Sequence, residues 1–219
     1  CWPTVFFENH DTTRMASKVC PNGMYRDELS KLLAVMQMTF KGVPFVYQGQ
    51  EIGMTNSKFQ SIDDFRDVES LNFYRQETEK GKDKEEIYRI VKAGSRDNGR
   101  TPMCWTADEN AGFTTGKPWF HVNPNYKTIN VAQQEEDPDS ILNFYRKAIK
   151  LRKQLSCVRH GTYQEYFHNS DKFYMYSMTD ESQKILVVCS FSEKQTKVPT
   201  PKGFDLSKGK LILCNYEAP

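Results

Sequence analysis

The chain has 219 residues, of which 38% are hydrophobic and 26% are charged. That composition is typical of a globular protein, and the length allows one large domain or a domain with a small additional module. Lys and Arg total 30 against 28 Asp and Glu, so the net charge of +2 provides no chain-wide field for nucleic acid or an anionic membrane. No apolar run approaches the roughly 18 residues of a membrane-spanning helix. We therefore exclude fibrous, disordered and membrane-spanning classes, and we expect no nucleic-acid or membrane partner.

The six cysteines and four histidines are too widely spaced for a metal-binding motif. Even the closest pair of cysteines, Cys1 and Cys20, is 19 residues apart. We therefore expect reduced thiols in a cytoplasmic protein, with no metal site and no cofactor. The chain opens on Cys1 and runs at once into an apolar strand. We interpret it as a fragment whose true start, with the missing N-terminal part of the protein, lies upstream.

Residues 2–7 form a short apolar run that predicts a β-strand, and the polar cluster Glu8-Asn9-His10-Asp11 follows it directly. Residues 25–41 carry apolar side chains at the i, i+3, i+4, i+7 spacing of a buried helix face. Gly42 is placed to cap the end of that helix. Residues 45–47 predict a second strand, again followed by polar residues. This order predicts a parallel βαβ unit with its polar groups at the strand ends.

The next stretch, from Gln48 to Pro138, covers about ninety residues without a strong strand signal, which suggests a wall or lid over a site. It contains two predicted short helices, at residues 67–78 and 84–93. A further helix is predicted over residues 141–154, after a start signal at residues 137–140. Its basic side chains are expected to be solvated rather than to bind an anion. They are Arg146, Lys147, Lys150, Arg152 and Lys153.

Beyond Ser156 the hydrophobic pattern changes to a period of two, which predicts a small antiparallel β module. The expected strands are residues 162–167, 173–178, 184–191, 195–198 and 210–214. We therefore expect two domains, with the boundary between residues 1–156 and 157–219.

Two features could carry chemistry. Asn9-His10-Asp11 follows a strand, and a carboxylate beside an imidazole can hydrogen-bond a polyol or stabilise developing positive charge. Residues 95–130 form a polar segment that combines arginines and turn-forming residues with aromatic side chains. Flat rings beside planar donors suit a sugar, which is apolar on one face and hydroxylated at its edges. Taken alone, the first signal is more often a loop cap and the second is more often loop packing.

Taken together, these segments resemble one family. The matching motifs, in chain order, are Phe7-Glu8-Asn9-His10-Asp11 with Arg14, residues 42–56 (GVPFVYQGQEIGMTN), 66–72 (RDVESLN), 95–103 (SRDNGRTPM), 111–116 (AGFTTG) and 122–126 (VNPNY). They resemble the oligo-1,6-glucosidase and α-glucosidase branch of glycoside hydrolase family 13, the α-amylase family. The resemblance covers nearly the whole chain, and its motifs are long and ordered.

The resemblance implies an α/β fold, a (β/α)8 TIM barrel followed by a small antiparallel β-sandwich. Residues 4–7 would be barrel strand seven and residues 25–41 helix seven. Residues 45–47 would be strand eight, followed by a long loop and by helix eight at residues 139–154. Residues 1–156 would thus be the C-terminal part of the catalytic barrel, and residues 157–219 a truncated β-sandwich.

The resemblance also implies hydrolysis of α-glucosidic bonds with retention, by a nucleophilic carboxylate and an acid/base carboxylate. Asp11 would be a third carboxylate, the transition-state stabiliser, with His10 as its hydroxyl-binding neighbour. Arg96 would hold the terminal glucose in the −1 pocket, and Glu69 would line the +1 side. Arg14 lies in the same motif as Asp11 and is grouped with the substrate-binding residues near the pocket, but packing or pairing is the role favoured for it.

The chain departs from the family pattern in two places and lacks two catalytic groups. Gln50 stands where the family usually has Glu, and Thr12-Thr13 replace Gln-Pro before Arg14; both changes could alter the shape of the pocket. The nucleophile and the acid/base would lie upstream, so we expect the isolated chain to be inactive. The sequence leaves three hypotheses: an α-glucosidase acting on isomalto- or malto-oligosaccharides, a trehalose-6-phosphate hydrolase, and a non-catalytic family member.

Overall fold

The computed structural model describes residues 2–216, which form two compact units. The first unit contains residues 2–5, 31–45 and 144–216, and the second contains residues 6–30 and 46–143. Two helices, α2 (Arg26–Thr39) and α6 (Ile141–Gln154), each contribute residues to both units. No helix in the described residues has the length and hydrophobicity to span a membrane.

In the first unit, β1 (Thr4–Val5) pairs in parallel with β2 (Val43–Pro44). The buried side chains of α2 include Leu32, Leu33 and Met36, as the spacing predicts. The predicted parallel strand–helix–strand order is therefore confirmed. The second strand was predicted at residues 45–47, which is wrong, because the ladder ends with the bond from the Phe45 N–H to the Val5 carbonyl (2.9 Å).

Gly42 does not cap the helix, because α2 already ends at Thr39. Its backbone has φ = +145°, in a region that favours glycine. A Cβ atom at this position would lie 2.5 Å from the Pro3 carbonyl oxygen. The glycine is thus required where the chain passes close to the residues that precede β1.

Arg152 of α6 is a correction to the solvated basic face predicted for this helix. Its Nη1 atom donates to the carbonyls of Met38 (2.8 Å) and Phe40 (3.1 Å), and its Nη2 atom donates to that of Gly42. The guanidinium therefore satisfies carbonyls at the end of α2, which have no partner inside the helix. Periodicity cannot reveal this role, because it depends on a contact across more than 100 residues of chain.

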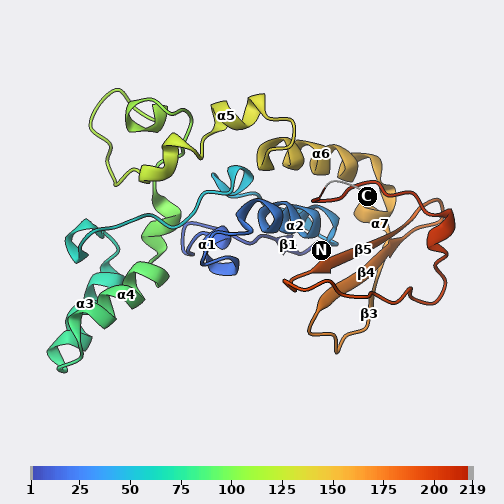
Figure 1. Cartoon of the computed structure of the whole chain (residues 1–219), viewed down its shortest axis with the longest axis horizontal. Coiled ribbons are helices and arrows are strands. Elements are labelled where there is room, and N and C mark those ends of the chain that lie inside the picture. Colours follow the sequence, from blue (N-terminus) through green and yellow to red (C-terminus); the bar gives the residue numbers. More distant parts are fainter. Residues whose placement is uncertain (1, 217–219) are drawn as a thin grey trace. The chain divides into compact units, whose positions relative to one another are not determined.

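Three antiparallel strands complete the first unit in the order β3–β4–β5 (Figure 1). They are β3 (Thr162–Tyr166), β4 (Phe173–Thr179) and β5 (Lys184–Ser190), and α7 (Ser156–His160) precedes them. Cys157 and Val158 of α7 pack with Met178 of β4 in a buried cluster. Three of the five predicted strands are confirmed.

The two remaining predicted strands, residues 195–198 and 210–214, are irregular and pair with no other strand in the described structure. Their side chains are mostly exposed, so their alternating pattern has no apolar face to bury. The described residues 157–216 thus contain one three-stranded sheet, and the expected sandwich would require a second sheet stacked on it.

The second unit is made of helices and loops, and no strand occurs in its described residues. Its helical pair is α3 (Val68–Glu79) and α4 (Lys84–Gly94) (Figure 1). Both helices begin at an aspartate that accepts a backbone N–H of the first turn, Asp67 from Ser70 and Asp83 from Glu86. The shorter elements are α1 (Met15–Val19), α5 (Val131–Glu136), and the 3-10 turns η1 (Gln50–Ile52), η2 (Ile62–Asp64), η3 (Arg96–Arg100), η4 (Glu109–Gly112) and η5 (Pro124–Lys127).

Two hydrophobic clusters hold these loops together. One surrounds Ile52 and Met54, and the other contains Phe59 and Phe65 packed against Ile87 of α4. The long connection predicted from the sequence is therefore an ordered structure with its own core, as expected for a wall of a site.

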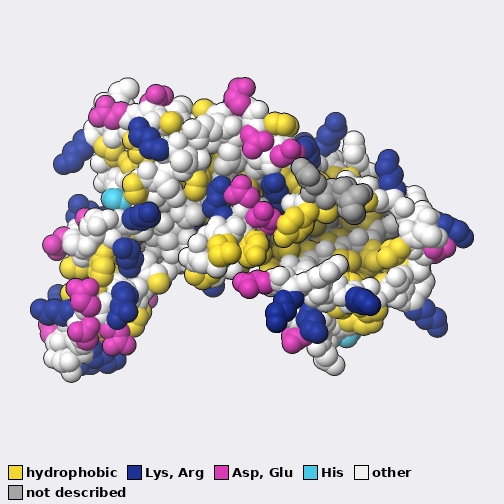
Figure 2. Space-filling view, in the orientation of Figure 1, with side chains coloured by type: hydrophobic (Ala, Val, Ile, Leu, Met, Phe, Trp, Pro, Cys, Tyr) yellow, Lys and Arg dark blue, Asp and Glu magenta, His cyan; other side chains and the backbone are white. Residues whose placement is uncertain are grey.

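Large hydrophobic side chains are exposed on the first unit. Trp2, Val43 and Phe45, on or beside the two parallel strands, are about half exposed. Figure 2 shows further hydrophobic side chains in the region where Figure 1 places the three-stranded sheet. An uncovered apolar face beside unpaired strand edges promotes association.

We expect the isolated chain to self-associate or to be poorly soluble, because these side chains and strand edges are open to other molecules. Sedimentation velocity at several concentrations measures this directly. A single monomeric species at all concentrations would contradict the expectation.

Replacing Arg152 by Met should lower the free energy of unfolding by about 1–3 kcal/mol, since the apolar stem stays while the carbonyls at the end of α2 lose their donor. Urea denaturation measures the change. Lys150→Met, at an exposed position of the same helix, is the control and should have little effect. Equal stability of the two variants would contradict the proposed role of the guanidinium.

Candidate functional site

The turn at Asn9–Thr12 presents His10 and Asp11 to solvent. The Asn9 Oδ1 atom accepts the Asp11 N–H (2.8 Å), and the Thr12 Oγ1 atom accepts the Asn9 N–H (3.1 Å). His10 Nε2 lies 3.2 Å from Asp11 Oδ2, and both side chains are largely exposed. Thr12, one of the departures from the family pattern, therefore helps to close the turn that carries the carboxylate.

Arg14 lies beneath this turn and is fully buried. Its Nη1 atom donates to Glu8 Oε2 (3.1 Å) and to the Gln48 carbonyl (2.7 Å), and its Nε atom donates to the Asn98 carbonyl (3.2 Å). Burial raises the pKa of Glu8, while Arg14 opposes that shift. Arg14 thus joins three separate segments, and its side chain does not line the pocket.

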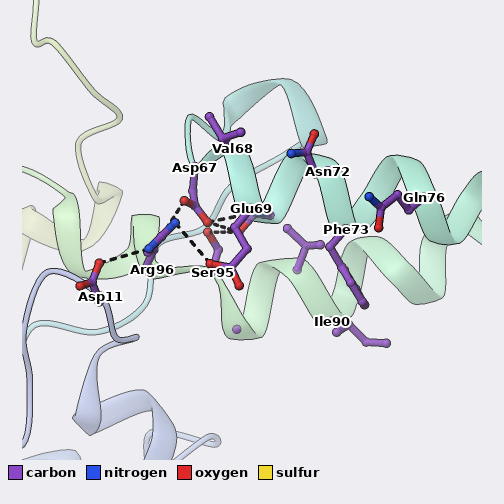
Figure 3. A pocket seen from close by; sticks show the side chains of 13 residues that line it. Asp11, Asp67, Val68, Glu69, Asn72, Phe73, Gln76, Ile90, Ser95 and Arg96 are labelled. Atoms are coloured by element: carbon purple, nitrogen blue, oxygen red, sulfur yellow. Dashed lines mark hydrogen bonds and ion pairs between the residues drawn. The ribbon is translucent and has the colours of Figure 1, made fainter.

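Arg96, the first residue of η3, lies between three carboxylates (Figure 3). Its Nε atom is 2.6 Å from Asp67 Oδ1, its Nη1 atom is 3.3 Å from Asp11 Oδ1, and its Nη2 atom is 3.3 Å from Glu69 Oε2. The hydrogen bond with Asp67 is the main cause that raises the pKa of the guanidinium. Arg96 thus contacts both Asp11 and Glu69, so three of the predicted site residues lie next to one another.

Asp67 is the buried anchor of the cluster, and its side chain is only 4% exposed. Burial acts to raise the pKa of Asp67, but hydrogen bonds from Ser70 and Arg96 outweigh it and hold the pKa below its usual value. Asp97 supports this position in turn, since its Oδ2 atom accepts the backbone N–H groups of Arg66 (2.7 Å) and Asp67 (2.8 Å). The start of α3 is therefore fixed against η3.

Arg100 is a site residue that the sequence analysis did not single out. Its Nε atom donates to the His10 carbonyl (2.9 Å), and its Nη2 atom lies 3.1 Å from Asp11 Oδ1. Between the two arginines, Gly99 allows η3 to approach the turn, because a Cβ atom there would lie 2.6 Å from the Thr12 carbonyl oxygen. The available signal was the spacing of Arg96 and Arg100, four residues apart in a segment rich in planar donors.

A pocket of about 800 Å³ adjoins this cluster (Figure 3). Asp11, Asp67, Glu69 and Arg96 line its charged end, and residues of α3 and α4 line the remainder. That volume lies within the range of about 300–1,000 Å³ that is usual for small-ligand sites. The arrangement can hydrogen-bond a polyhydroxylated ligand and stabilise positive charge on it.

The structure therefore brings together four of the five predicted site residues, namely Asp11, His10, Arg96 and Glu69. Arg14 is placed apart from them, in the pairing role that was favoured for it. Gln50 is buried at the start of η1 and does not line the pocket, so this departure from the family pattern lies in the interior of the second unit.

Residues 1–161 match the family described as the catalytic domain of alpha amylase. The chain belongs to this family. Oligo-1,6-glucosidase of Bacillus cereus is 42% identical over 99% of this chain, and trehalose-6-phosphate hydrolase of Bacillus subtilis is 40% identical over the same share. In both cases the match covers 39% of the relative, so the chain spans about two fifths of the length of these relatives.

Solved structures of the family agree. Trehalose-6-phosphate hydrolase of Bacillus licheniformis superposes with a TM-score of 0.93 at 42% identity, covering 100% of this chain and 40% of that chain. Isomaltulose synthase of Erwinia rhapontici gives a TM-score of 0.83 at 42% identity, covering 88% and 35%. The βαβ unit of β1, α2 and β2 fits the C-terminal part of the family's barrel, as predicted.

Replacing Asp67 by Asn should lower the free energy of unfolding at pH 7 by about 1–3 kcal/mol, because the charged partner of Arg96 and Ser70 is lost. The pKa of Asp67 in the folded protein lies below its usual value, so its charge stabilises the fold above about pH 4. That contribution is lost as the pH falls through the lowered pKa.

The wild type and Asp67→Asn should therefore differ less in free energy of unfolding at pH 3 than at pH 7. Urea denaturation at both pH values measures the difference. Glu69→Gln is the matched control, since Glu69 also pairs with Arg96 but its side chain is 79% exposed, and it should change stability little. If Asp67→Asn lowers the free energy of unfolding equally at both pH values, the negative charge of Asp67 does not contribute to stability.

Proposed function

We propose that this chain forms the C-terminal part of the active site of a retaining α-glucosidase, which releases terminal glucose from isomalto- or malto-oligosaccharides. The observation that carries the proposal is the cluster of Asp11, Arg96 and Glu69 at one end of a ligand-sized pocket, with His10 paired to Asp11 beside it. Membership of the family and the similarity to glucosidases support it.

Asp11 is the residue that stabilises the transition state. One of its oxygens is held by Arg96 and Arg100, and the other faces His10 at the exposed side. The carboxylate is thereby fixed in orientation before the substrate arrives, so it can hydrogen-bond sugar hydroxyls and oppose the positive charge of an oxocarbenium-like transition state.

The other residues bind the substrate. His10 donates to or accepts from the same hydroxyls, and Arg96 holds the terminal glucose in the −1 pocket. Glu69, the most exposed of the carboxylates paired with Arg96, lines the +1 side. We assign Arg14 to positioning rather than to contact with the sugar, because it is buried below the turn.

The nucleophile and the acid/base belong, by resemblance to the family, to barrel strands that precede the Asn9-His10-Asp11 segment. A retaining mechanism needs both carboxylates. We therefore expect the 219-residue chain alone to release no glucose from isomaltose or maltose in a coupled glucose assay. Turnover by the purified chain would contradict this division of roles.

In the full-length enzyme, Asp11→Asn should lower kcat about 10²- to 10³-fold, because the amide cannot oppose the developing positive charge. Steady-state kinetics on isomaltose measure the effect. Asp63→Asn, at an exposed position outside the pocket, is the matched control and should retain activity. Unchanged kinetics of Asp11→Asn would overturn its assigned role.

Trehalose-6-phosphate hydrolysis is the second candidate, favoured by the 42% identity to the Bacillus licheniformis enzyme across the whole chain. Comparing the kcat/KM of the full-length enzyme for isomaltose, maltose and trehalose-6-phosphate separates the two. A preference for the phosphorylated sugar would replace the first assignment by the second.

We further propose a domain boundary between residues 156 and 157, with the three-stranded sheet as part of a β-sandwich in the full-length enzyme. The buried cluster in which Cys157 and Val158 pack with Met178 of β4 supports it, because these residues join the sheet rather than α6. A cytoplasmic location is also proposed, and it is supported by the cysteines of residues 2–216, which are all free and of which four are buried.

A further inference from the structure

We propose that a second pocket, in the first unit, binds a small molecule that joins a flat aromatic ring to a negative charge, which is the chemistry of a mononucleotide. The pocket has a volume of about 750 Å³, within the usual range for small-ligand sites. It belongs to the first unit, whereas the pocket beside Asp11 belongs to the second. The side chains that carry the argument are Trp2, Phe40, Lys41, His160, Tyr163 and Tyr174.

Two basic side chains of this second pocket have no acidic partner. Within residues 2–216, neither Lys41 nor His160 forms an ion pair, and no Asp or Glu lines the pocket. Both lie beside Trp2. The Lys41 Nζ atom is 5.5 Å from the centre of the indole ring, and the His160 ring meets the indole edge to face at 6.3 Å between centroids. Basic groups gathered without a carboxylate attract an anion.

The other walls of the second pocket are aromatic. Trp2 is 48% exposed, so part of its ring is open to a ligand. Phe40 and Tyr174 meet edge to face, with 6.1 Å between their ring centroids, and Tyr163 lies beside Tyr174. Aromatic rings prefer stacked or edge-to-face contacts with other rings, so these walls favour a flat ligand.

The carboxylate of Glu165, which lies behind the tyrosines, does not neutralise the basic groups. The hydroxyls of Tyr163 and Tyr174 hydrogen-bond to each other, and they lie 3.1 and 3.4 Å from Glu165 Oε2. The other carboxylate oxygen, Oε1, lies 3.3 Å from His168 Nδ1. Glu165 is thus held by these three residues, and the charge of Lys41 stays available.

The backbone around the second pocket is held by contacts that do not involve a ligand. The Val43 N–H donates to the Pro3 carbonyl (2.8 Å), which fixes the segment that follows Trp2. Arg152 donates to the carbonyls on either side of Lys41, those of Phe40 and Gly42. A pocket that is formed before its ligand arrives loses less conformational freedom on binding.

Isothermal titration calorimetry on the full-length enzyme tests the inference with three probes. Adenosine 5′-monophosphate (AMP) has both a flat ring and a negative charge, adenosine lacks the charge, and ribose 5-phosphate lacks the ring. We expect AMP to bind at least about tenfold more tightly than either of the others, because each group contributes a separate contact. The pocket beside Asp11 is lined by more carboxylates than guanidiniums, so AMP is not expected to bind there.

Two substitutions assign the binding to the second pocket. Lys41→Met removes the charge from an exposed side chain, and Trp2→Ala removes the exposed ring. Each should weaken AMP binding about tenfold. Lys41→Arg and Trp2→Phe keep the charge and a ring, and should retain most of the affinity.

The matched controls change the same residue types outside the second pocket. Lys172→Met alters an exposed lysine of the first unit, and Trp119→Ala alters an indole that is 65% exposed. Both should bind AMP as the wild type does. Since Lys41 is exposed, Lys41→Met remains informative even if Trp2→Ala does not fold.

Three results would overturn the inference: no binding of AMP to the full-length enzyme, binding that neither Lys41→Met nor Trp2→Ala weakens, or equal binding of AMP and one of the two partial probes. None of them bears on the glucosidase assignment, which is measured by turnover. Tight binding of AMP that falls in both variants and is kept by Lys41→Arg would establish the site.

Discussion

The geometry of the second unit depends on one buried guanidinium. Arg14 has no solvent exposure, and its nitrogens bind the carboxylate of Glu8 and the carbonyls of Gln48 and Asn98. Removing a charge from water costs several kcal/mol unless nearly every donor is satisfied, so these contacts are what make its burial possible. In return, three segments that are distant in the sequence are held at fixed separations.

The exposed site follows from that buried junction. Asp11 lies three residues before Arg14, and Arg96 lies two residues before Asn98, so fixing Arg14 against Asn98 also sets the turn against η3. Gly99 permits the close approach, and Arg96 and Arg100 then bridge it at the surface. The contact between the Asn9–Thr12 turn and η3 is thus held in the interior by the bond from Arg14 to Asn98, and at the surface by the ion pairs of Asp11 with Arg96 and Arg100.

Local signals in the sequence were sufficient for the longer helices α2, α3, α4 and α6, whereas the short helices α1, α5 and α7 were not predicted. The helices α3 and α4 were predicted within one residue of their bounds, since each begins at a capping aspartate in a polar segment. Family motifs identified Asp11, His10, Arg96 and Glu69, which the structure brings together. The contributions of Asp97, Arg100 and Arg152 depend on partners about 30 to 110 residues away, and periodicity and capping rules contain no such information. The same limit explains the misplaced strand at residues 45–47 and the two strands predicted near the C-terminus, because strand pairing is a non-local event.

The charged end of the pocket has a consequence for which molecules enter it. Four carboxylates, those of Asp11, Asp67, Glu69 and Asp97, surround only two guanidiniums, those of Arg96 and Arg100, which leaves two negative charges in excess. Such a field attracts cations and repels anions over a distance that shrinks as salt is added. The part of the site that this chain supplies should therefore favour a cationic group over a neutral one, and more strongly at low ionic strength. A phosphorylated sugar, by contrast, would need basic groups elsewhere in the full-length enzyme to offset the repulsion from the part of the site that this chain supplies.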